Sequence, residues 1–71
     1  MNQVRAVSNA INEILWVNNI TEKELANKLG CSQSTVRNWI KGKNFPSSRY
    51  SWKIKEMYGV KLGQIIINSM D

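Results

Sequence analysis

The segment at residues 33–41 carries most of the side chains in this chain that could contact another molecule specifically. Its hydrogen-bonding side chains are Gln33, Ser34, Arg37, Asn38 and Lys41. The apolar residues of the segment, Val36, Trp39 and Ile40, recur at i, i+3 and i+4, which is the spacing of one helical face. The sequence therefore predicts a helix that turns an apolar face inward and a face of donors and acceptors outward.

Catalysis and metal binding have few residues to draw on. The chain has no histidine, one cysteine and five carboxylates. Glu24 is expected to cap a helix and the other acids are scattered, so no acid–base pair and no nucleophile with its base is visible. A glycine-rich phosphate loop is also missing. We therefore expect no enzyme, no metal site and no cofactor.

Most of the basic residues lie in the helix at 33–41 and in the segment that follows it. The formal net charge is +5. No acid interrupts residues 32–55, which hold six of the ten basic side chains, namely Arg37, Lys41, Lys43, Arg49, Lys53 and Lys55. This basic stripe favours an anionic partner such as nucleic acid over a merely solvated lysine-rich face.

Two short helices must position these side chains. Thr21 and Glu24 have the spacing of a capping box, which predicts a helix beginning at Thr21. Gly30 follows Leu29 where a left-handed cap would end that helix. Ser32 can then cap a second helix. The turn is so short that the two helices are expected to cross at a steep angle.

The rest of the chain supplies a small core. Apolar residues at helical spacing predict helices over 2–17, from Ser47 or Ser48 to Tyr58, and over 62–69. Asn18 and Asn19 suit a turn, and residues 41–48 read as a loop that Phe45 holds to the core. Trp16 falls off the first stripe, and a core or flanking position is favoured for it.

Length and composition indicate one folded domain. At 71 residues with 42% hydrophobic content, we expect a single all-α domain over 1–71 with a small core. A single cysteine, Cys31, cannot form an intramolecular disulfide and is expected to be a buried thiol. No apolar run reaches the roughly 18 residues of a spanning helix, so we expect no membrane contact and a cytoplasmic location.

The central segment resembles a known family. The pattern T-x-x-E-L-A-x-K-L-G-C-S-Q-S-T-V-x-x-W-x-x-G is similar to the helix-turn-helix of the phage Cro and lambda-repressor-like family, also called XRE-type, and the later K-N-F-P and M-Y-G-V-K-L extend the likeness. The resemblance implies a compact five-helix DNA-binding domain and a transcription regulator. A repressor of the small phage Cro type is the form expected.

The resemblance also implies which side chains meet bases. The helix at 33–40 would lie in the major groove of double-stranded DNA. Gln33 suits adenine and Arg37 suits the paired acceptors of guanine. Ser34 can contact a base or a phosphate. Asn38 lies further along the helix, and whether it contacts a base depends on how far its side chain reaches. Thr35 can contact a thymine methyl group or hydrogen-bond the preceding turn.

Phosphate contacts are implied on both sides of that helix. Lys41, Lys43 and Asn44 would contact the backbone after it, and the helix start at Thr21 would offer its N–H groups. Many relatives place a glutamine next to this cap, whereas this chain has Glu22. A carboxylate repels phosphate, so Lys23 is the expected substitute at that contact.

The end of the chain suggests self-association. Ile65, Ile66 and Ile67 sweep about 200° around a helix, so they cannot all face one core. Ile67 and Met70 would form an exposed apolar strip, and we expect a homodimer contact there in preference to a tolerated patch. The expected partner is a pseudo-palindromic operator, with no small-molecule ligand.

One other class of function stays open. An antirepressor or antitoxin-like adaptor could use the same fold to bind a protein through Trp16, Trp52 and Ile67. An RNA binder is disfavoured because a helix cannot read the deep, narrow groove of A-form RNA.

Overall fold

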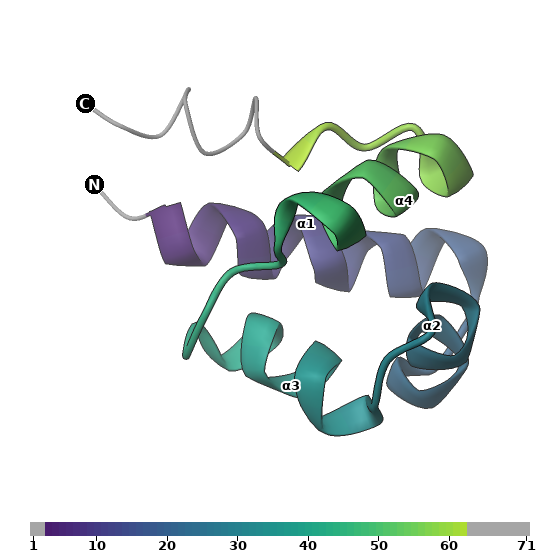
Figure 1. The fold of residues 1–71 in the computed structure, drawn as a ribbon, viewed down its shortest axis with the longest axis horizontal. Coiled ribbons are helices and arrows are strands. Elements are labelled where there is room, and N and C mark those ends of the chain that lie inside the picture. The colour runs from purple at the N-terminus through teal and green to yellow at the C-terminus, as the bar shows by residue number, and fades with distance from the viewer. Residues whose placement is uncertain (1–2, 63–71) are drawn as a thin grey trace.

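The computed structural model describes residues 3–62, which form four α-helices and no β-strand (Figure 1). Helix α1 spans Gln3–Asn18, α2 spans Glu22–Leu29, α3 spans Gln33–Lys41 and α4 spans Ser48–Tyr58. The predicted all-α class and these four helices are confirmed. Beyond Leu62, the predicted fifth helix lies outside the described residues, as do Ile67 and Met70.

Local signals fix where α2 begins and ends. The Thr21 hydroxyl accepts a hydrogen bond from the Glu24 amide at 3.1 Å, and the Glu24 carboxylate accepts one from the Thr21 amide at 2.8 Å. This capping box is the predicted one. Gly30 ends the helix with φ at 81°, a left-handed conformation that favours glycine. Asn19 likewise turns the chain after α1 with φ at 53°.

All four helices contribute to one core. Helix α3 packs against both α1 and α2, and α4 packs against α2. The buried apolar side chains are Val7, Ile11, Ile14, Leu25, Ala26, Leu29, Val36, Trp39, Ile54 and Leu62. Because α1 and α2 hold α3 from two sides, its remaining face is left outward (Figure 1).

Three apolar side chains lie further out than the sequence predicts. Trp16 is 84% exposed, because it sits two residues and thus about 200° beyond the buried Ile14. Phe45 is also exposed, and the neighbouring Pro46 is the buried residue of this loop. Met57 is exposed as well, although its spacing of three residues from Ile54 predicts a place on the apolar face of α4.

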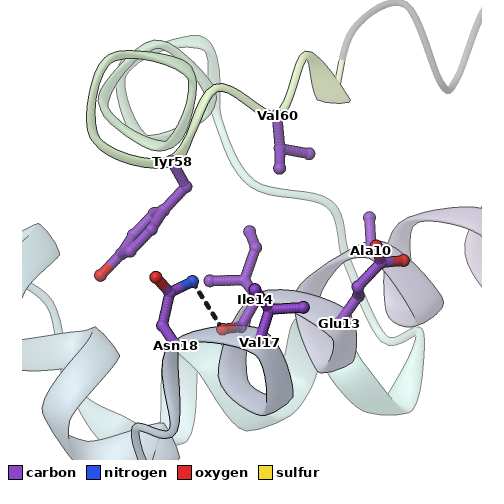
Figure 2. A pocket seen from close by; sticks show the side chains of 7 residues that line it. All are labelled: Ala10, Glu13, Ile14, Val17, Asn18, Tyr58 and Val60. Atoms are coloured by element: carbon purple, nitrogen blue, oxygen red, sulfur yellow. Dashed lines mark hydrogen bonds between the residues drawn. The ribbon is translucent and has the colours of Figure 1, made fainter.

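A pocket of about 300 Å³ opens between α1 and the segment that ends α4 (Figure 2). Its walls are lined by Ala10, Glu13, Ile14, Val17, Asn18, Tyr58 and Val60. The Asn18 amide donates to the Ile14 carbonyl at 2.9 Å, as the dashed line shows. The buried Tyr58 hydroxyl has no hydrogen-bond partner within residues 3–62, and burial raises its pKa.

Two further properties concern the same described range. No helix within it is long and apolar enough to cross a membrane. No group of three or more Cys, His, Asp or Glu side chains there could hold a metal ion.

Candidate nucleic-acid interface

Helix α3 separates its buried and exposed side chains sharply. Val36 and Trp39 are at most 3% exposed, and the Trp39 ring lies 5.7 Å from that of Tyr50 on α4. The Ser8 hydroxyl of α1 donates to the Ile40 carbonyl at 2.6 Å, which occupies one of the carbonyl groups that a helix end leaves unpaired. The apolar face and the far end of α3 are therefore both fixed to the domain.

The opposite face of α3 presents the predicted base-contacting side chains. Gln33, Ser34 and Arg37 are exposed, and Asn38 is half-buried. Gln33 and Ser34 stand in the first turn, which is the end that approaches base edges in helix-turn-helix proteins. The structure thus brings these four residues onto one accessible surface, as the sequence predicts.

Thr35 takes part in the cap of the same helix. Its amide donates to the Ser32 hydroxyl at 3.2 Å, and the two hydroxyl oxygens lie 2.9 Å apart. The contact between the Thr35 and Ser32 hydroxyl groups is one of the two predicted alternatives for Thr35. Its methyl contact with a thymine does not need the hydroxyl and stays a prediction.

Arg37 has a partner that the sequence analysis missed. Its Nε donates to the Glu22 carboxylate at 3.2 Å, across the turn between α2 and α3. The side chains of Arg37 and Glu22 are 50% and 30% exposed. Glu22 is therefore paired with the residue expected to read guanine. The signal available in the sequence was the acidic Glu22 itself, facing a helix rich in hydrogen-bond donors.

The start of α2 offers several groups to an anion. The Thr21 amide already donates to the Glu24 carboxylate. The Thr21 hydroxyl accepts a hydrogen bond from the Glu24 amide, but it can still donate its own hydrogen to an anion. The amides of Glu22 and Lys23 belong to the first turn, which has no acceptors within the helix. Lys23 is exposed beside them. A phosphate could meet this group, with the carboxylate of Glu22 opposing it.

The basic stripe is shorter in the structure than in the sequence. Lys41, Lys43 and Asn44 are exposed at the end of α3 and in the loop after it, as the phosphate assignment requires. Lys53 instead turns inward, and its ammonium group donates to the Leu29 carbonyl at 3.0 Å. A cation at this position complements the carbonyl end of α2. Lys53 therefore belongs to the scaffold and not to the interface.

Lys53→Met is expected to lower the free energy of unfolding by about 1–2 kcal/mol, because a partly buried charged hydrogen bond is lost. Urea denaturation monitored by circular dichroism measures this. Lys55→Met, at an exposed position on the same helix, should change it by less than about 0.5 kcal/mol. Equal effects of the two substitutions would contradict the role given to Lys53.

Cys31 follows Gly30 in the turn and packs against the core. Burial raises the pKa of its thiol, and the positive charge of Lys53 acts in the opposite direction. The thiol therefore stays protonated near neutral pH, which fits a structural residue.

Comparisons with known proteins agree with this geometry. A family model described as helix-turn-helix matches residues 18–65. The chain is also 40% identical over 55 residues to an uncharacterized HTH-type transcriptional regulator of Methanocaldococcus jannaschii, and the match covers 78% of this chain and 83% of that protein. No solved structure matches significantly. With α2 and α3 placed as described, the chain belongs to the XRE-type helix-turn-helix family.

Proposed function

We propose that this protein is a sequence-specific regulator of transcription that binds double-stranded DNA, and that it acts as a repressor of the small phage Cro type. The observation that carries the proposal is the outward face of α3, where Gln33, Ser34 and Arg37 are exposed while Val36 and Trp39 anchor the helix. Family membership supports DNA binding and regulation of transcription, and such regulators are generally not enzymes.

In this proposal α3 lies in the major groove with its first turn against the bases. The Gln33 amide donates to N7 and accepts from N6 of adenine, and Arg37 donates to O6 and N7 of guanine. Ser34, Asn38 and the Thr35 methyl group add contacts that depend on how deeply the helix enters.

Phosphates would be held on either side of the groove. Lys41, Lys43 and Asn44 contact one backbone segment, and Thr21 with the amides of Glu22 and Lys23 contacts another. These contacts set register and salt dependence and carry no sequence information directly.

A single domain of this kind reads too few bases to find one site, since each correct base adds about 1–3 kcal/mol of discrimination. We therefore propose a homodimer on a pseudo-palindromic operator, with half-sites about 10 base pairs apart. The apolar Ile67 and Met70 near the end of the chain are the proposed dimer contact.

Ile67→Glu is expected to shift the protein from dimer to monomer, because a charge in an apolar contact loses its hydration. Sedimentation velocity with and without operator DNA measures the association. Lys61→Glu introduces the same charge at an exposed residue that is not part of the proposed contact and should leave association unchanged. A variant at Ile67 that associates as tightly as the parent would remove this contact from the proposal.

Selection of bound sites from random duplexes tests the function itself. The expected result is a short motif repeated with two-fold symmetry, with guanine and adenine at invariant positions. Binding should weaken steeply with salt. Recovery of no enriched sequence would overturn the proposal.

A second function is favoured by one observation. Trp16 and Trp52 are 84% and 61% exposed, which suits contact with another protein. An adaptor of the antirepressor or antitoxin-like kind would form a stable protein complex and bind every duplex weakly. The salt dependence of DNA binding separates the two functions.

A further inference from the structure

We infer that Glu22 is a positioning residue for base recognition, which holds the Arg37 guanidinium so that its terminal amino groups face the DNA. The observation behind this is the 3.2 Å contact between the Arg37 Nε and the Glu22 carboxylate. The inference rests on the proposed function and extends it, because it makes a guanine contact depend on a residue whose side chain need not touch DNA.

Arg37 contacts Glu22 through Nε and not through its terminal nitrogens. A guanidinium has five N–H donors in a planar fork, and Nε supplies one of them. A carboxylate on Nε leaves the two terminal nitrogens at the far end of the plane, where they can donate in parallel to O6 and N7 of guanine. The described contact thus occupies the one nitrogen that this readout does not need.

The helices on either side make the contact a fixed one. Glu22 is the first residue of α2 and lies between Thr21 and Glu24, whose two capping-box hydrogen bonds hold the backbone on either side of it. Arg37 lies in the second turn of α3, whose inner face is buried at Val36 and Trp39. Since both backbones are held, pairing restricts the rotamers that a long, half-exposed arginine would otherwise sample.

The charge of Glu22 also favours contact of Arg37 with a base over contact with a phosphate. An unpaired arginine on this surface would be drawn to any phosphate, which gives affinity without sequence preference. With Glu22 beside it, the pair is neutral overall and the carboxylate repels phosphate. Arg37 is thereby directed to a base edge, while the phosphates are left to Lys41 and Lys43, both exposed.

Two substitutions of Glu22 separate its position from its charge. Glu22→Gln removes the charge, so affinity for random duplex should rise about fivefold while preference for guanine over adenine falls about fivefold. Glu22→Asp keeps the charge but shortens the side chain by one methylene group. In that variant the affinity for random duplex should stay unchanged while the guanine preference still falls.

The measurements are fluorescence anisotropy titrations on the selected operator, on an operator with adenine in place of the contacted guanine, and on a random duplex. Glu13→Gln is the matched control, because it removes one carboxylate from the α1 pocket, away from the exposed face of α3. The guanine preference of the Glu13→Gln variant should equal that of the parent. In an Arg37→Ala background, Glu22→Gln should no longer change the guanine preference, since the group that Glu22 positions is gone.

The outcomes distinguish this inference from the proposed function. A parent that prefers guanine, with Glu22→Asp and Glu22→Gln both losing that preference, supports the inference. A parent that prefers guanine, with both variants keeping the preference, overturns the inference alone. Should Glu22→Gln lower the thermal midpoint enough to unfold the protein, Glu22→Asp decides. A parent with no preference among duplexes would overturn the proposed function, and the inference with it.

Discussion

Trp39→Ala is expected to lower the free energy of unfolding by about 3–5 kcal/mol, the cost of truncating a fully buried aromatic side chain. Trp39 is 3% exposed and its ring lies 5.7 Å from that of Tyr50, so the substitution empties the junction between α3 and α4. A domain of 71 residues has a total stability of about 4–11 kcal/mol, so most of it would be lost.

Thermal unfolding followed by circular dichroism measures this effect, and the midpoint should fall by more than about 15 °C. Trp16→Ala is the matched control, because it removes the same side chain from a position that is 84% exposed. That variant should stay within about 0.5 kcal/mol of the parent. Similar losses for the two variants would contradict the burial that fixes α3.

Arg37→Ala is expected to relax the preference at one operator position by about 1–3 kcal/mol, which is the value of one bidentate contact to guanine. The affinity for random duplex should fall by less than the affinity for the operator, because random duplex loses only the effect of one positive charge, whereas the operator loses the guanine contact as well. Adding Gln33→Ala should relax a second position by a similar amount, roughly additively for separate bases.

Lys43→Ala provides the contrast. Lys43 is exposed in the loop after α3, where a phosphate contact is proposed. Its loss should weaken binding to all sequences alike and reduce the slope of log affinity against log salt by about 1. If Arg37→Ala instead weakened specific and random DNA equally, its assignment to a base would be wrong.

The sequence predicted the features that short-range chemistry determines. The Thr21 and Glu24 box, the Gly30 cap and the apolar positions of α3 all depend on residues within about one or two turns of one another. These local signals were enough to place the two helices and to say which face of the second points outward.

Contacts between distant residues were beyond that reasoning. The Glu22 to Arg37 pair spans 15 residues and the Lys53 to Leu29 bond spans 24. Each joins two different helices, so the periodicity of a single helix cannot predict it. A count of charges treats Lys53 and Lys43 alike, although one is half-buried against a carbonyl and the other is exposed. Only the packing of α4 against α2 distinguishes them.

The division of α3 into two faces has a consequence for engineering. The groups that hold the helix in place are the side chains of Val36 and Trp39 and the backbone carbonyl of Ile40, which is bound to Ser8. None of these is among the side chains offered to solvent. The exposed positions could therefore be rewritten in a library to recode operator preference, with the inner positions kept constant so that the scaffold tolerates every member.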